Sequence, residues 1–465
     1  MHRVSIRVHG YKHPPKKIEK DLTQGPLLKQ IILYSIPLVL TSILLHVFKT
    51  ADIAVLGIFV GDRAVAAVGS TTSLISLLTM LFIGISVGVN AMVSRYIGAQ
   101  DEESVKRTIG MSVLLALIFG ALLILVGQLF SRPMLELMGC DENVIDLAEK
   151  YIKVYFYGVP LVVLYNFMSA IMRASGDTVR PLIYLIIGGV LNVGLNLFFV
   201  LVLNKDVEGV AIATVASQGV SALLCIISLA KAKGIVKLRV RYMRIFKKEL
   251  LEVLKIGLPS GIQSSLFSIS NVILQSAINS FGEFAMAGSS YAAEIDVYIY
   301  ACMNSIAVAT MSFISQNYGA RNFERVKKSI LYSVCIAASL GLIIGVLVVV
   351  LGSPLIKLLS DQEEVINYFN TRNLIMGLTY FLCGIMEVFS YSVRGLGKSI
   401  VSMLISLLGA CLFRIVWVFI IVKLTGNFAM IWWSYTASWA LTIVLFIPVL
   451  IKLIKKLKME TQTIE

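Results

Sequence analysis

Long uninterrupted runs of apolar residues restrict what this chain can fold into. Ile109–Phe130 and Ile330–Leu351 contain no charged residue, and each has about the 20 residues that a helix needs to cross the hydrocarbon core of a bilayer. A membrane β-barrel would instead show segments of about ten residues with alternating polarity, and no such alternation is present. The composition agrees, since 57% of the residues are hydrophobic and 15% are charged, whereas about a quarter are charged in soluble domains. We therefore predict an all-α integral membrane protein.

Twelve candidate membrane helices can be placed along the sequence. Their approximate bounds are 28–55, 64–93, 108–130, 149–172, 181–203, 208–231, 249–279, 285–315, 328–351, 369–394, 400–423 and 428–452. The first is too long for a cleaved secretory signal and no small-residue cleavage site follows it, so we expect it to be retained. The organisation that we expect is a basic tail over 1–26, a six-helix bundle over 27–231, a linker over 232–248, a second bundle over 249–452 and a tail over 453–465.

Lys and Arg concentrate in alternate connections between these spans. The N-terminal tail and the linker are the most basic, while the intervening connections hold acids such as Asp141 and Asp361. Because Lys and Arg mark cytoplasmic loops, we expect a multi-pass protein of the cytoplasmic membrane with both termini in the cytoplasm. Anionic lipid headgroups account for the net charge of +14. We therefore expect membrane lipids, and no nucleic acid, as partners.

The sequence repeats itself at an offset of 221 residues. SRYIGAQDEESVKR at Ser94–Arg107 corresponds to SQNYGARNFERVKK at Ser315–Lys328, and Pro, Gly and Arg positions stay in register over the following segment. An offset of six helices preserves the orientation in the membrane, so the halves are parallel repeats. We predict two six-helix bundles around a central cleft, with alternating access by rocking of one bundle against the other.

A proline lies inside the first helix of each half. Pro37 and Pro259 correspond after one residue of slippage, and each removes a helical hydrogen bond and bends its helix. A static bend and a bend that moves during gating are both open interpretations.

Asp52 is the one clear carboxylate within the spans of the first half. Ionisable groups in the hydrocarbon are costly and indicate function by default. Three amides and a hydroxyl fall at compatible depths, given a rise of about 1.5 Å per residue; they are Asn166, Asn192, Asn196 and Thr214. Oxygen ligands of this kind suit H⁺ or Na⁺. We expect these residues to form the site of the coupling ion. If that ion is Na⁺, we expect it to bind at Asp52, Asn192 and Asn196.

Two alternatives remain for these residues. Asp52 could pair with Lys49, three residues earlier on a neighbouring helical face. The amides and Thr214 could serve only as interhelical hydrogen bonds in packing.

The second half does not repeat this carboxylate. Glu294 and Asp296 lie on its second helix at about the depth of Arg414, and we expect one of them to pair with that arginine. Direct contact of these acids with a cationic substrate is the alternative. Glu387 lies seven residues before Arg394 on the same face, and it either pairs with that arginine or lines the cleft.

Nothing in the sequence indicates an enzyme or a bound cofactor. The segments outside the spans are too short for a catalytic domain, and Gly395–Ser399 lacks the first glycine of a phosphate loop, whose place Ser392 takes. The energy source is then an ion gradient. A flippase for lipid-linked saccharides or another lipid-like substrate is the alternative function. A saccharide-lipid flippase would favour a cationic cleft for the pyrophosphate, and only Arg414 and Lys49 are candidate intramembrane cations.

Several motifs, in this order, resemble the multidrug and toxic compound extrusion (MATE) family. They are Ile36-Pro37, Asp52–Gly57, Ala66–Gly69, the SRYIGAQ and SQNYGAR turns, Arg173–Thr178 and Leu191–Asn196. The resemblance covers about residues 25 to 455 and implies a V-shaped two-lobe fold that exports amphipathic organic cations against H⁺ or Na⁺ entry.

The similar DinF-like members bind the proton or cation in the first lobe. Their residues correspond to Asp52, Asn166, Asn192, Asn196 and Thr214. An aspartate of those members is Asn196 here, which weakens the case for Na⁺ and favours H⁺. We expect a monomer that transports small organic substrates.

Overall fold

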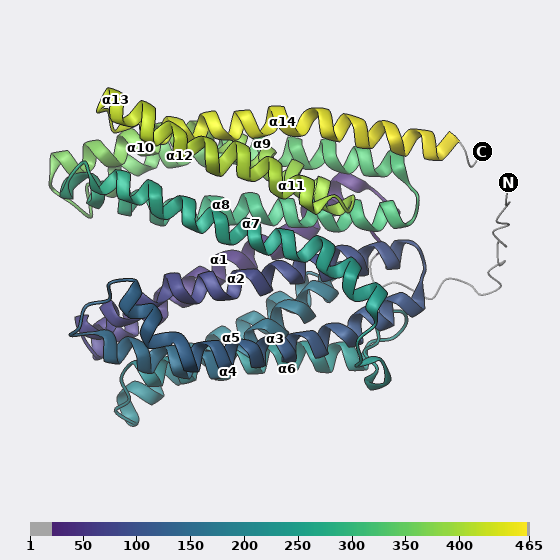
Figure 1. The fold of residues 1–465 in the computed structure, drawn as a ribbon, viewed down its shortest axis with the longest axis horizontal. Coiled ribbons are helices and arrows are strands. Elements are labelled where there is room, and N and C mark those ends of the chain that lie inside the picture. The colour runs from purple at the N-terminus through teal and green to yellow at the C-terminus, as the bar shows by residue number, and fades with distance from the viewer. Residues whose placement is uncertain (1–20, 463–465) are drawn as a thin grey trace.

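The computed structural model describes residues 21–462, so most of the predicted basic tail lies outside the described part. All the regular structure in that range is helical (Figure 1). The first half contains α1 (Leu27–Phe59), α2 (Asp62–Gly98), α3 (Glu102–Leu137), α4 (Ile145–Ala174), α5 (Val179–Leu197), the π-helical turn η1 (Phe198–Val202) and α6 (Val207–Lys231).

The second half begins after a linker that contains the short helix η2 (Val240–Tyr242). Its helices are α7 (Lys247–Asn279), α8 (Glu283–Gly319), α9 (Phe323–Ile356), α10 (Glu363–Gly395), a segment built from α11 (Ser399–Ser406), η3 (Leu407–Leu412), α12 (Phe413–Trp417), η4 (Val418–Val422) and α13 (Lys423–Thr425), and finally α14 (Ala429–Gln462). The last helix thus continues past residue 452, where we expected a tail to begin.

Eleven helical segments of the described chain are long and apolar enough to cross a membrane. The other long helix, α7, falls short because polar residues recur along it, and Ser260, Gln263 and Ser270 among them are buried. The predicted all-α membrane architecture is confirmed, with α7 as a polar member of the set.

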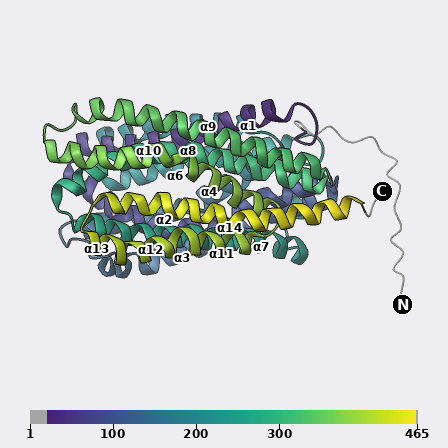
Figure 2. The same cartoon turned by 90° about the horizontal axis from the view of Figure 1, so that it is seen from above.

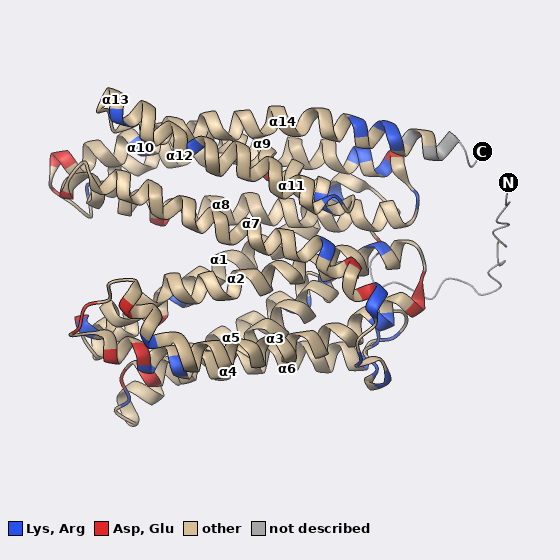
Figure 3. Ribbon diagram, viewed as in Figure 1, with Lys and Arg blue, Asp and Glu red and all other residues tan. Residues whose placement is uncertain are grey.

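The two halves form two lobes. In Figure 1, α1–α6 make up the lower lobe and α7–α14 the upper one. The apolar core of the first lobe also takes in buried residues of α7, α8 and α10, whereas a second core lies wholly within the upper lobe. The start of α1 and the end of α14 lie at the same end of the molecule (Figure 2), and Lys and Arg gather there (Figure 3). The opposite end of the first lobe carries both signs, since Arg132 pairs with Asp146 and Glu149.

Glycines allow the lobes to meet backbone to backbone. A Cβ on Gly84 of α2 would lie 2.2 Å from the Cα of Gly261 of α7. The glycine of the repeated SRYIGAQ turn brings α2 equally close to α8, because a Cβ on Gly98 would lie 1.8 Å from the carbonyl oxygen of Gln316. The lobes are therefore joined where no side chain larger than hydrogen fits.

This junction lies in the half of the molecule that carries the termini. Going from the termini toward the opposite end, α1 and α8 make two last polar or aromatic contacts in the described part of the chain. The hydroxyl groups of Ser42 and Ser305 lie 3.2 Å apart, and the ring centroids of His46 and Tyr298 lie 6.1 Å apart. Beyond them, α1 exposes apolar side chains such as Ile58, 74% accessible. The lobes thus separate toward the end opposite to the termini.

Pro37 and Pro259 both lie inside continuous helices. The Thr41 hydroxyl donates a hydrogen bond to the Pro37 carbonyl at 2.7 Å. A role of either proline in gating remains a prediction.

Candidate ion and substrate cavity

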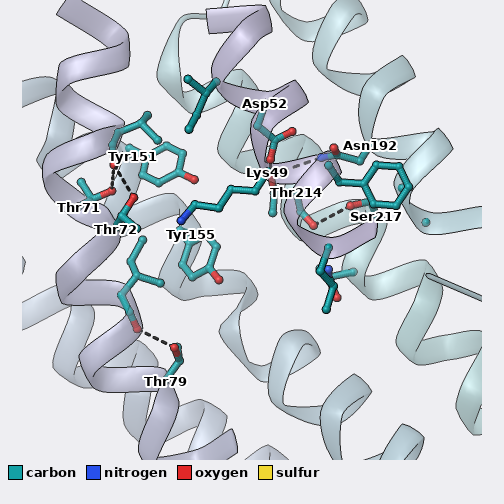
Figure 4. A pocket seen from close by; sticks show the side chains of 18 of the residues that line it. Lys49, Asp52, Thr71, Thr72, Thr79, Tyr151, Tyr155, Asn192, Thr214 and Ser217 are labelled. Atoms are coloured by element: carbon teal, nitrogen blue, oxygen red, sulfur yellow. Dashed lines mark hydrogen bonds between the residues drawn. The ribbon is translucent and has the colours of Figure 1, made fainter. Parts of the chain in front are cut away.

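A cavity of about 260 Å³ lies inside the first lobe, between α1, α2, α4, α5 and α6. Its wall is rich in hydroxyl groups, and of the residues that the structure describes, only Asp52 and Lys49 line it with a charge (Figure 4). Its polar lining also includes Thr71, Thr72, Ser76, Thr79, Tyr151, Tyr155, Asn192 and Thr214.

The Asp52 carboxylate accepts hydrogen bonds from two other helices. The side-chain nitrogen of Asn196 donates to Oδ1 at 2.5 Å, and the Thr214 hydroxyl lies 3.3 Å from Oδ2. Asn192 completes the cluster, since its nitrogen lies 3.4 Å from the Thr214 hydroxyl and its oxygen 3.4 Å from the Asn196 nitrogen. Four residues predicted from the sequence are thus brought together.

The backbone of α5 explains how two amides reach one carboxylate. Asn192 and Asn196 are one turn apart and lie on the same helical face, and they are 4% and 0% exposed. The π-helical turn η1 follows directly after Leu197, and turns of this kind are frequent at functional sites.

Asn196 also presents an unused acceptor. Its buried side-chain oxygen has no hydrogen-bond partner in the described part of the chain. A buried polar group without a partner is costly, and most such groups in native proteins are hydrogen-bonded. This oxygen is therefore available to a bound ion or to a protonated carboxyl group.

The geometry departs from one expectation for this lobe, on Asn166, and from one of the alternatives, on Lys49. Asn166 donates to the carbonyl of Val162 at 2.8 Å and makes no hydrogen bond to the Asp52 cluster within the described range. Lys49 forms no ion pair with Asp52 there, and Figure 4 shows the lysine side chain extending away from the carboxylate. The alternative of an Asp52–Lys49 pair is therefore wrong for this arrangement of the lobes.

The predicted ion pair of the second lobe is also wrong. Asp296 pairs with Arg372 of α10, whose guanidinium lies 4.2 Å from the Trp432 ring. Arg414 instead donates to the Ser438 hydroxyl at 2.7 Å and lies over the Tyr435 ring. From the sequence we considered only Arg414 as the partner, because the depth of a residue along its helix does not show which way its side chain points.

The other two acids of this lobe occupy different environments. Glu294 is exposed on α8. Glu387 is buried and accepts a hydrogen bond from the Tyr300 hydroxyl at 3.4 Å. Arg394 lies over the ring of Tyr391 and makes no ion pair with Glu387 among the residues that the structure describes.

Known proteins resemble the chain over most of its length. A probable multidrug resistance protein of Bacillus subtilis (strain 168), YoeA, is 28% identical over 426 residues, which cover 90% of this chain and 92% of the relative. A solved outward-facing structure of a multidrug resistance MATE family transporter of the MOP superfamily is 24% identical, with a TM-score of 0.87 over 94% of this chain and 98% of that one. A MOP superfamily transporter from Pyrococcus furiosus Vc1 is also 24% identical, with a TM-score of 0.88 over 96% and 100% of the two chains.

The family model described as MatE matches the chain twice, at residues 37–198 and 259–420. The two matches confirm the internal duplication, and together they span more than half of the sequence. The chain therefore belongs to the MatE family, whose members are membrane transporters rather than enzymes.

Proposed function

We propose that the protein is a secondary antiporter of the cytoplasmic membrane that exports amphipathic or cationic organic compounds in exchange for H⁺ or Na⁺. The observation that carries this proposal is the Asp52 carboxylate, held beside a cavity by donors from α5 and α6. The relative YoeA, a probable multidrug resistance protein, supports the substrate class. Each chain contains both lobes and the cavity, so a monomer would suffice.

Asp52 is the proposed site of the coupling ion. The oxygen atoms of Asp52, Asn192 and Asn196 are hard ligands of the type that Na⁺ prefers. A proton would instead turn the Asp52 carboxyl group into a hydrogen-bond donor. A half-turn of the Asn196 amide would then offer its unpartnered oxygen as the acceptor.

The arrangement of the lobes fits one step of alternating access. The lobes meet at the end that carries the termini and separate at the other end. With both termini in the cytoplasm, as the basic connections favour, this is the outward-facing step, in which ions enter and substrate leaves. Ion binding at Asp52 would rearrange the first lobe and release the substrate, and rocking of the lobes would return the cavity to the cytoplasm.

Transport by the purified protein in proteoliposomes tests the proposal. An H⁺ gradient and a Na⁺ gradient are imposed separately, and export of a fluorescent organic cation is followed. We expect one gradient to drive export and Asp52→Asn to abolish it without lowering the amount of protein in the membrane. Asp62→Asn, which removes an exposed carboxylate at the start of α2, is the matched control. Gradient-driven export that persists in Asp52→Asn would refute the role of Asp52.

A further inference from the structure

We propose that the first-lobe cavity binds an anionic group, a carboxylate or a phosphate, on the exported compound through Lys49, Tyr151 and Tyr155. This inference rests on the proposed function and narrows it: the substrates would be zwitterionic amphipaths, with a cationic group directed to Asp52 and an anionic group to Lys49.

The two charges of the cavity have different surroundings. Asp52 is engaged by Asn196 and Thr214, whereas Lys49 makes no ion pair within the described part of the chain. Figure 4 shows its side chain crossing the cavity toward Tyr151 and Tyr155. A lysine ammonium carries three donors and no acceptor, so its charge is available to a ligand.

The tyrosines add donors of the same kind. Tyr151 and Tyr155 lie one turn apart on α4, with stacked rings whose centroids are 6.1 Å apart, and both line the cavity. Their hydroxyl groups have no hydrogen-bond partner among the residues that the structure describes. Lys49 is exposed to the cavity, and its ammonium group and the two O–H groups are donors on one side of that cavity. The oxygens of a carboxylate or phosphate can accept from all three, and the bond to the ammonium is charge-assisted and strong.

Two other titratable groups lie near Lys49, and neither forms an ion pair with it. His46 lies on the same helix and Glu294 on α8 of the second lobe, and Glu294 is not within ion-pair distance. The anionic group of a substrate would therefore be the first counter-ion that Lys49 meets in this arrangement. When the coupling ion binds Asp52, it neutralises the carboxylate that holds the cationic group of the substrate. The substrate then binds less tightly and leaves, as exchange of ion for substrate requires.

A matched pair of dyes tests this inference. The first is a xanthene dye with a free carboxylate, which is a zwitterion, and the second is the methyl ester of the same dye, which is a cation. Binding of each to the purified protein is measured by fluorescence anisotropy, and export is measured in proteoliposomes. We expect Lys49→Gln to lower the ratio of free-acid to ester affinity on the order of tenfold, the effect of one charge-assisted hydrogen bond. Lys49→Arg should retain most of the ratio, and Tyr155→Phe should lower it by less.

Lys205→Gln, which removes an exposed lysine near the start of α6, controls for the loss of a positive charge and should leave the ratio unchanged. An unchanged ratio in Lys49→Gln, or an equal loss of affinity for both dyes, would overturn the inference. If neither gradient drives export of either dye while the ratio depends on Lys49, the antiport proposal fails and the anion site stands.

Discussion

At the scale of single residues, the environment of Asp52 depends on whether position 196 holds an amide or an acid. The Asn196 amide donates to the carboxylate at 2.5 Å, so the cluster holds one negative charge. A second carboxylate there would interact strongly with the first at such a distance, and a cation between them would relieve the repulsion.

We therefore expect Asn196→Asp to raise the apparent affinity for Na⁺ at least tenfold, as the Coulomb energy of an added charge at a few ångströms implies. The measurement is the rise in melting temperature of the purified protein when NaCl replaces choline chloride. Asn166→Asp is the matched control, because Asn166 is bonded to its own helix and lies outside the cluster. An equal rise in both variants would contradict the prediction.

A second prediction at the scale of single residues concerns the Asp296–Arg372 ion pair. Removal of one partner leaves the other charge buried, which costs about 3–5 kcal/mol. Asp296→Asn and Arg372→Gln should each lower the thermal stability of the purified protein, and the double variant should lose less than their sum. Asp296→Asn combined with Arg414→Gln should be additive, because Arg414 bonds to Ser438 instead.

The residues of the candidate site were predictable to different degrees. Asp52 stood out because a lone carboxylate in an apolar run is costly, and the spacing of Asn192 and Asn196 placed both on one face. Arg372 was missed and Asn166 misplaced relative to the cluster because side-chain direction depends on how helices rotate and pack. Depth along a helix carries no such information.

At the scale of elements, the junction of α2 and α7 depends on glycine. Gly84 and Gly261 approach so closely that a Cβ on Gly84 would lie 2.2 Å from the Cα of Gly261. We expect Gly84→Ala to destabilise this packing by about 1–3 kcal/mol, the cost of overfilling a packed interface.

The expected result is a lower melting temperature of the purified protein. Gly69→Ala, on the same helix, is the control, since nothing lies within 4 Å of the added Cβ. Equal melting temperatures for the two variants would show that the junction adjusts without cost.

Helices as elements were predictable because apolar runs and loop charges follow directly from the bilayer. The π-helical turns of η1, η3 and η4 were not, because they arise from backbone hydrogen bonding that leaves no distinct pattern of side chains. The polar character of α7 was visible in its sequence, but its cause was not. The buried Ser260 lies in the segment of α7 that packs on Gly84 of α2, a contact that appears only once the lobes are assembled.

At the scale of the whole molecule, the duplication produces two lobes that meet at the end carrying the termini. In the proposed transport cycle, this seam between the lobes would open toward the cytoplasm. The segment before α1 crosses this seam. Leu22 bonds through its backbone to Gln316 and Asn317 of α8. Arg325 of α9 donates to the carbonyl groups of Leu22, Gln24 and Gly25 and to the side chain of Gln30, at 2.7 to 3.1 Å.

Arg325 thus ties the start of the first lobe to the second lobe, and opening toward the cytoplasm requires these bonds to break. Because hydrogen bonds to a charged group contribute about 1.5–3 kcal/mol each, Arg325→Ala should raise the inward-facing population at least tenfold. Spin labels placed at the cytoplasmic end of each lobe would report this shift as a longer distance. Lys328→Ala removes an exposed charge on the same helix and should leave the distances unchanged. If the distance distribution of Arg325→Ala matches that of the parent protein, the bonds of Arg325 do not hold the seam closed.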